Sequence, residues 1–262
     1  MATDHKDIYQ HFRPSETDFV DKVFGWVSQV DNSYTTYLTD FLDPRQVTIA
    51  QSIIASSSLQ SFVSSDFIGG EYARLLIAPD YYQLDQADFE ISLLEVDYNR
   101  KFNQISHGQV MGTLINQLGI RRTVFGDILL TDDHLQVYVM TSMLSYFQEN
   151  VKKIGKASVK LRQCKLEERV QVKESFKEDL VLVSSLRLDK VVASVLKLSR
   201  SVSLKLIASQ KVKLNYSIAD RASEELSIGD LVSVRGYGRF TLDSLAGLSK
   251  QGKHKLIIKR TT

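Results

Sequence analysis

The sequence predicts an α+β protein in three parts: a helical N-terminal segment over residues 1–64, a ferredoxin-like (split βαβ) middle domain over 65–178 and a small α+β domain over 179–262. Three observations lead to this division. A chain of 262 residues is longer than one ordinary domain. The spacing of its apolar residues changes from helical to a mixture of alternating and helical patterns. Its charge is acidic in the first half and basic in the second.

The N-terminal segment is predicted to be mostly helical. Ser15 is expected to cap a helix over residues 16–30, whose apolar residues recur at helical spacing. Pro44 is expected in the first turn of a second helix, which extends to Ile54 before a run of serines at 56–58. Because such apolar stripes are most often core, we assign this segment no chemistry.

The middle part alternates strands with helices. A strand over 73–78 ends at Pro79. The expected order then continues as strand 89–96, helix 106–118, strand 126–130, strand 135–140, helix 142–154 and strand 158–164. With the first strand set aside, this order is βαββαβ, which is typical of ferredoxin-like folds. RNA-binding domains, metal carriers and sensors all use that fold, so it does not decide the function.

Two features of the middle part bear on RNA binding. The strand over 135–140 has one aromatic residue, Tyr138, and lacks Lys and Arg, so bases are not expected to stack on this sheet. Arg121 and Arg122 follow the first helix of this domain, and RNA contact and a solvated loop are equally compatible with their position.

The net charge of +2 conceals a strong asymmetry. Residues 1–150 carry 9 Lys and Arg against 20 Asp and Glu, whereas residues 151–262 carry 24 against 11. A basic C-terminal part favours a polyanionic partner, because Lys and Arg release counterions condensed on phosphates. From charge alone, a solvated basic face that binds nothing explains the numbers equally well.

The C-terminal part begins with an amphipathic helix, because apolar residues from Leu188 to Leu196 recur at helical spacing. Ser199 is expected to cap a second helix over 200–209. Strands are expected over 211–215 and 231–235. Two short helices on a small sheet are expected to gather six basic residues into one cradle for a folded RNA backbone: Arg187, Lys190, Arg200, Lys205, Lys211 and Lys213.

These residues also form a recognisable motif. A close resemblance to the RNA-binding domain of the ribosomal-protein-S-four type is carried by Arg187-Leu188-Asp189-Lys190, Ser199-Arg200, Lys205, Ile207, Val212, Leu214, Asn215 and Gly229-Asp230. It implies that the six basic residues contact RNA phosphates. It also implies that Asp189, Ser199 and Asn215 organise the helix start, the cap and the hairpin. Two turns depart from the pattern, with Gln210 in place of Gly and Asn215-Tyr216 in place of Asn-Gly.

The whole chain resembles the bacterial YlmH family. The resemblance is carried by Leu118-Gly119-Ile120-Arg121-Arg122, Gly126-Asp127-Ile128 and Arg235-Gly236-Tyr237-Gly238-Arg239-Phe240. It implies a ribosome quality-control protein that binds ribosomal RNA and tRNA on large subunits carrying obstructed peptidyl-tRNA and assists untemplated tail addition. The family's genes also neighbour cell-division genes. The resemblance adds Arg121, Arg122, Arg235 and Arg239 to the expected RNA-binding residues.

Enzyme signatures are missing from the sequence. The five histidines have no metal-binding spacing, and there is no phosphate-binding loop or nucleophile elbow, so we expect no catalytic residue, metal or cofactor. The alternative is an RNA-modifying enzyme. Arg187-Leu188-Asp189 resembles the catalytic triplet of pseudouridine synthases, but the Thr-Ser-Gly that follows it in those enzymes is absent.

The expected location is the cytoplasm. Cys164 is the single cysteine, so a disulfide framework is excluded. The start of the chain does not resemble an export signal, and membrane insertion is not expected, because the longest charge-free stretch is interrupted by glutamines and serines. The acidic N-terminal part is expected either to repel non-specific RNA or to meet a protein partner.

Overall fold

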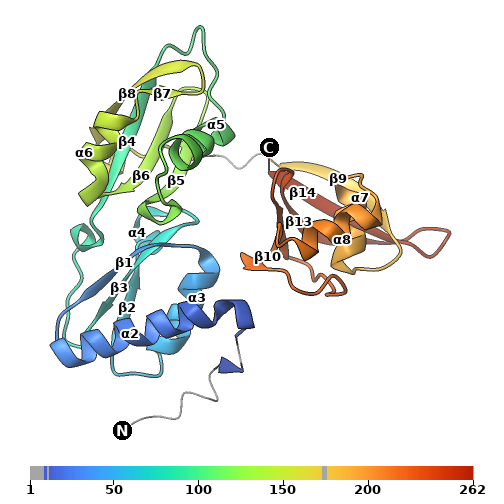
Figure 1. The fold of residues 1–262 in the computed structure, drawn as a ribbon, viewed down its shortest axis with the longest axis horizontal. Coiled ribbons are helices and arrows are strands. Elements are labelled where there is room, and N and C mark those ends of the chain that lie inside the picture. The colour runs from blue at the N-terminus through green and yellow to red at the C-terminus, as the bar shows by residue number, and fades with distance from the viewer. Residues whose placement is uncertain (1–8, 11, 173–175, 262) are drawn as a thin grey trace. The chain divides into compact units, whose positions relative to one another are not determined.

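The computed structural model describes residues 9–10, 12–172 and 176–261 (Figure 1). Their internal contacts divide the chain into two compact units. One unit is residues 17–172, and the other joins the described residues before 17 to those after 172. Residues 1–8, which include most of the stretch that bears on export, lie outside the described part.

The first part of the chain contains a sheet that the sequence did not reveal. Its elements are a 3₁₀ turn at Pro14–Glu16, α2 (Thr17–Ser33), β1 (Tyr37–Leu42), α3 (Pro44–Ile54), β2 (Gln60–Val63), α4 (Ser65–Ile68) and β3 (Ala73–Ala78). The strands form an antiparallel sheet in the order β1-β3-β2. The two expected helices are present, and the structure adds β1 and β2, which are short and include polar residues that hide the strand pattern.

Each of the two expected domain boundaries falls within a sheet of the structure. The boundary after residue 64 separates β2 from β3, although the six residues of β3 are buried at the centre of the first sheet. The boundary after residue 178 cuts β9 (Phe176–Val183), which belongs to the C-terminal sheet. In both cases pairing with distant strands, which a local pattern does not record, decides where the strand belongs.

The two N-terminal helices begin differently. At α3 the expectation is confirmed, with Pro44 in the first turn and a capping box in which the Asp43 carboxylate accepts from Gln46 N at 2.9 Å. At α2 the expected Ser15 cap is wrong, because the 3₁₀ turn runs directly into the helix. The Glu16 carboxylate accepts instead from Arg13 N at 3.0 Å.

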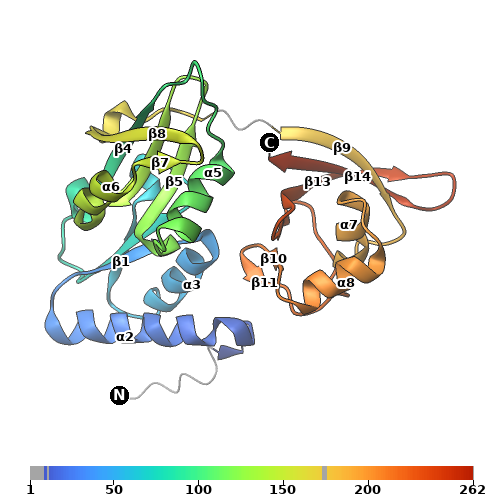
Figure 2. The same cartoon turned by 45° about the horizontal axis from the view of Figure 1, so that its top comes forward.

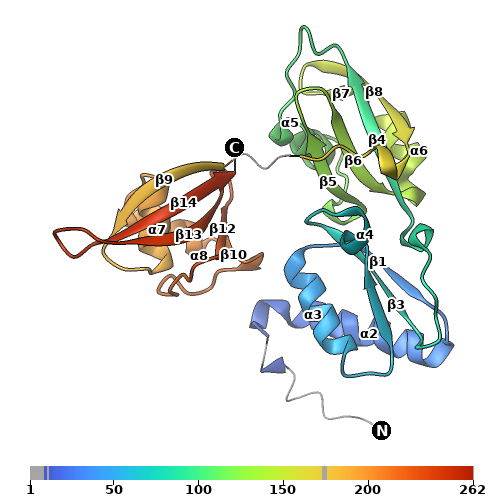
Figure 3. The ribbon, with the colours of Figure 1, turned by 180° about the vertical axis from the view of Figure 1, so that it is seen from behind.

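The middle domain has the expected ferredoxin-like topology (Figure 3). Its strands lie in the order β5-β6-β4-β8-β7, and all neighbouring pairs are antiparallel. The helices pack on one face of this sheet over a core that includes Val110, Phe125 and Phe147. The elements are β4 (Ile91–Tyr98), α5 (His107–Met111), a π-helical turn (Gly112–Gln117), β5 (Phe125–Leu130), β6 (Leu135–Met140), α6 (Leu144–Asn150), β7 (Lys153–Ile154) and β8 (Ala157–Cys164).

Helix ends in this domain show where local signals suffice. Ser106 caps α5 as expected, in a capping box with Gln109. Gly119 follows the helical stretch with φ of 64°, as a helix stop requires. The helix expected over 142–154 is too long, because the chain turns at Gly155 and residues 153–154 pair with β8.

The other face of the middle sheet is covered by the first part of the chain. Phe41 and Ile68 pack against Leu93 and Tyr138 of this sheet, and Figure 3 shows α4 at the junction. Tyr138 is 2% exposed and donates from its hydroxyl to Ile68 O at 3.3 Å. Burial raises the pKa of Tyr138 to about 12. This face is therefore closed to stacking bases.

The C-terminal unit places two helices on one face of an antiparallel sheet (Figure 2). The expected helices and short strands are confirmed, whereas β9 and the long β13–β14 hairpin were not expected. The sheet order is β11-β10-β12-β13-β14-β9. With β9, the elements are α7 (Leu188–Val195), α8 (Arg200–Ala208), β10 (Val212–Leu214), β11 (Ser217–Ile218), β12 (Leu231–Val234), β13 (Gly238–Leu248) and β14 (His254–Thr261).

Described N-terminal residues belong to this unit as well. Arg13 Nη2 lies 2.7 Å from Glu224 Oε1, and Ser217 donates from its hydroxyl to the Glu16 carboxylate. Glu16 is 7% exposed.

Among the described residues, no helix combines the length and the apolar character that a membrane span requires.

Candidate nucleic-acid interface

A buried carboxylate organises the start of α7. Asp189 is 0% exposed, and its oxygens accept from Arg187 Nε at 3.1 Å and from Arg200 Nε at 2.8 Å. Burial raises the pKa of the Asp189 carboxyl, but the hydrogen bonds from the two arginines outweigh this effect, so the pKa lies below its ordinary value. The carboxylate is therefore ionised at neutral pH and holds two guanidinium groups together.

Further bonds tie the two helices at the same place. Ser203 donates from its hydroxyl to Asp189 O at 2.8 Å. Ser199 caps α8 as expected, by accepting from Val202 N at 3.3 Å. The arginine side chains remain reachable, because that of Arg187 is 34% exposed and that of Arg200 is 57% exposed. The site is thus rigid at its base and open at its surface.

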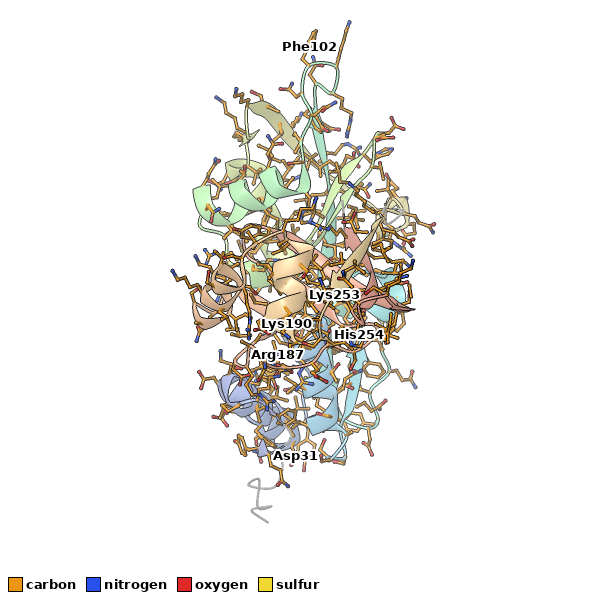
Figure 4. The ribbon with its side chains drawn as sticks, turned by 90° about the vertical axis from the view of Figure 1, so that its right-hand side faces the viewer. Asp31, Phe102, Arg187, Lys190, Lys253 and His254 are labelled. Atoms are coloured by element: carbon orange, nitrogen blue, oxygen red, sulfur yellow. The ribbon has the colours of Figure 1, made fainter. Side chains whose placement is uncertain are left out.

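The basic residues on the helices differ in their placement. Arg187 is the N-cap residue of α7, and the half-buried Lys190 lies in the first turn of this helix. Figure 4 labels both residues at this helix. Lys205 is exposed in the last turn of α8. It lies five residues after Arg200, which places it on a different face of that helix.

The basic residues on the strands point away from the helices. Val212 and Leu214 are buried beneath α7 and α8, so the exposed Lys211 and Lys213 alternate onto the opposite face of the sheet. Lys213 pairs with Ser233, which pairs with Arg239 on the same outer face. The exposed Arg235 lies in the turn between β12 and β13. The expectation of one cradle holding all six residues is wrong, because strand alternation separates the two lysines from the arginines.

The two unusual turns keep their geometry without glycine. Gln210 adopts φ of 56°, and Asn215 and Tyr216 adopt 48° and 69°, which are left-handed values. Asn215 holds the hairpin, because its amide donates to Asp230 Oδ1 at 2.8 Å and its side-chain oxygen accepts from Leu231 N at 2.9 Å. The expected organising role of Asn215 matches these contacts.

Arg121 and Arg122 have different surroundings. Arg121 is exposed. Arg122 is half-buried, with its guanidinium carbon 3.6 Å from the centre of the Tyr72 ring, and it donates to Phe125 O. Burial lowers the pKa of Arg122. Arg122 therefore joins the first part to the middle domain, and of the two only Arg121 is open to a partner.

Other chemistry finds little support within the described residues. No group of three or more His, Cys, Asp or Glu side chains there is placed to hold a metal ion. Cys164 is half-buried, and burial raises the pKa of its thiol, which opposes a reactive thiolate.

A ferredoxin-like domain followed by two helices on a small sheet, with arginines ordered at the helix starts, defines a multidomain protein of the RNA-binding class. Comparison with known families agrees. Residues 15–82 match the model described as "YlmH, N-terminal", residues 85–168 match "Putative RNA-binding domain in YlmH", and residues 186–232 match "S4 domain". The first two spans also keep β3 within the first part of the chain.

Individual relatives point the same way. The chain is 32% identical over 256 residues to "Ribosome-associated protein quality control protein P2" of Bacillus subtilis (strain 168), covering 97% of this chain and 98% of that protein. It resembles the solved structure of "Cell division protein ylmH from Streptococcus pneumoniae" with a TM-score of 0.56 and 39% identity, over 62% of this chain and 99% of the other. The chain belongs to the YlmH family.

Proposed function

We propose that the protein is a non-catalytic RNA-binding factor of the bacterial cytoplasm. It docks on ribosomal RNA, tRNA or both, and acts in quality control on large ribosomal subunits that carry obstructed peptidyl-tRNA. The observation that carries this proposal is the buried Asp189, which orders Arg187 and Arg200 from two different helices. The name of the Bacillus subtilis relative supports the ribosomal setting.

The chemistry of the two arginines suits a phosphate backbone. Arg187 donates to Asp189 from Nε and Nη2, and Arg200 donates from Nε. Each guanidinium keeps further N–H groups for a ligand, on a side chain that solvent reaches. Planar guanidinium forks match phosphate oxygens in geometry and in charge. Ordering them in advance lowers the entropic cost of binding. Such contacts supply affinity and register, while the shape of the folded RNA supplies specificity.

A salt titration of the full-length protein tests this proposal. Binding to isolated large subunits and to tRNA is measured at several salt concentrations for the wild type and for Arg200→Ala/Lys205→Ala. We expect weaker binding to every RNA and a salt slope that is smaller by about one unit per lost phosphate contact. Lys22→Ala, an exposed lysine of the acidic part, is the matched control. An unchanged slope in the double variant refutes the proposal.

The enzyme alternative places a different demand on Asp189. A catalytic aspartate has to reach the base that it attacks, whereas this carboxylate is 0% exposed and engaged by two arginines. We therefore expect no modified uridine after incubation with ribosomal RNA or tRNA. Formation of modified uridine that Asp189→Asn abolishes would replace the binding proposal with the enzymatic one.

The acidic N-terminal part has two roles open to it, repulsion of bulk RNA and contact with a protein partner. A variant that carries Asp21→Asn and Asp31→Asn, which removes two exposed negative charges from α2, distinguishes these two roles. Under repulsion, the variant binds unrelated RNA more tightly. Under partner binding, its affinity for unrelated RNA is unchanged and its recovery with ribosomes from cell extracts falls.

A further inference from the structure

Seven basic residues between 151 and 172 belong to the middle domain and lie outside the residues that match the S4 domain. Three of them, Lys153, Lys156 and Lys160, lie on β7, in the turn that follows and on β8, and all three side chains are exposed. None of the three forms an ion pair with a residue that the structure describes.

Strand register brings these lysines to the end of the sheet where β4 ends. Asp97 pairs with Lys160 and Tyr98 pairs with Val159 in the β4–β8 ladder. The β7–β8 turn therefore lies beside the loop over 99–106 that leaves β4. Figure 1 shows this loop projecting beyond the sheet, between β4 and α5.

The loop carries an exposed aromatic ring. Phe102 is 76% exposed, the largest exposed fraction among the large apolar side chains that the structure describes, and Figure 4 shows it at the tip. The turn beneath it is ordered, because Phe102 N donates to Asn99 O at 3.3 Å and the Asn103 amide donates to the same oxygen at 2.9 Å. A ring in this position is presented to solvent instead of being packed.

One cation lies close to that ring. Lys101 Nζ lies 5.7 Å from the centre of the Phe102 ring. Arg100 is held over Tyr98 at 4.5 Å and lies 3.7 Å from the Glu95 carboxylate. The carboxylate of Asp97, opposite Lys160 in the ladder, lies 3.7 Å from Arg162 Nε. The acidic turn at 132–133 lies on the β6 side of β4, away from β8.

An exposed aromatic ring beside unpaired lysines is the arrangement that binds unpaired nucleotides, with a base on the ring and phosphates on the cations. The sheet face that other RNA-binding domains use is closed here by Ile68 and Phe41. We propose that the loop over 99–104 and the β7–β8 turn form a second RNA site, in which Phe102 stacks on an unpaired base and Lys101, Lys153, Lys156 and Lys160 contact phosphates. This inference rests on the proposed RNA-binding function and adds a second surface to it.

The test uses the full-length chain and two labelled RNAs: a stem-loop with an unpaired adenine tail, and the same stem-loop without the tail. Phe102→Ala should weaken binding of the tailed RNA by about 5- to 150-fold, the range for loss of one stacked base, with little change in salt slope. Phe102→Tyr should retain binding, because it keeps the ring. Lys153→Glu/Lys156→Glu/Lys160→Glu should reduce the salt slope on the tailed RNA by about two units. Tyr34→Ala, which removes a ring that is 73% exposed in the acidic part, and Lys22→Glu are the matched controls.

Equal affinity of wild type and Phe102→Ala for the tailed RNA overturns this inference, as does an equal loss on both RNAs. If Phe102→Ala binds both RNAs normally but binds intact large subunits weakly, the loop contacts a ribosomal protein, and the inference fails. In these cases the proposed function still stands, provided that the affinity of Arg200→Ala/Lys205→Ala depends less steeply on salt concentration than that of the wild type. If the wild type binds neither RNA nor large subunits, the proposed function itself fails.

Discussion

Arg200 Nε of α8 donates to Oδ2 of Asp189 on α7 at a distance of 2.8 Å, so a buried carboxylate joins the two helices of the C-terminal unit. The same carboxylate accepts from Arg187. Asp189 therefore has two roles: it links α7 to α8, and it fixes the positions of two arginine side chains that solvent can reach.

Replacing Asp189 with Asn tests whether this carboxylate is a positioning residue. The amide keeps the shape but loses the charge, so we expect the free energy of unfolding to fall by roughly 1.5–3 kcal/mol, the range for a hydrogen bond to a charged group. Urea unfolding followed by circular dichroism measures this loss. RNA affinity should fall as well, although the variant is less acidic. A rise in affinity would show that Asp189 acts on RNA only through its charge.

Acid should destabilise the C-terminal unit through the same residue. A carboxyl whose pKa is lower in the folded than in the unfolded protein contributes its full stability above the unfolded value, near pH 4, and loses it as the pH falls through the folded value. We expect the urea concentration at the unfolding midpoint to decrease as the pH is lowered below about 4. This decrease should be less steep in Asp189→Asn. Asp243→Asn should change this pH dependence less than Asp189→Asn does. The Asp243 carboxylate pairs with Lys259 at 2.6 Å, but its side chain is 32% exposed. Identical slopes in wild type and Asp189→Asn would contradict this assignment.

Gly126 should be sensitive to a single methyl group. A Cβ at this position would lie 2.7 Å from Phe41 Cε1 and 3.1 Å from Tyr138 Cβ, where the first part packs on the middle sheet. We expect Gly126→Ala to destabilise residues 17–172 by about 1–3 kcal/mol through overpacking. Gly25→Ala in α2 has open space around its Cβ and should be stabilising by up to about 1 kcal/mol. Thermal unfolding of the two variants should shift in opposite directions.

Gln210 offers a stabilising substitution. It follows α8 with φ of 56°, a conformation that costs residues with a side chain roughly 1–2 kcal/mol and glycine very little. We expect Gln210→Gly to raise the free energy of unfolding by about 0.5–1 kcal/mol, because part of the relieved strain is offset by chain entropy. Ser209→Gly, at φ of −89°, should be destabilising. A destabilised Gln210→Gly would mean that the strain is absent in solution.

Much of the fold was available from local patterns. Four predicted features depend on residues within a turn or two of each other: the order of strands and helices in the middle domain, Pro44 in the first turn of α3, the caps at Ser106 and Ser199, and the amphipathic α7. The family motifs carried the remaining identification, because they combine residue types with fixed spacing. Short strands such as β2 were not predicted, because four residues give too little alternation of polar and apolar side chains to recognise.

By itself, the sequence determined the α+β fold class, the polarised charge and the membership of the YlmH family, because each is written in composition or in neighbouring residues. Tertiary structure alone decided that Arg122 is engaged while Arg121 is open, that Lys213 faces away from Arg187, and that the middle sheet is closed by Ile68. Those facts depend on contacts such as that of Tyr138 with Ile68, between residues 70 apart in the chain. A spacing rule records neighbours along the chain, whereas burial and facing are set by what folds against them.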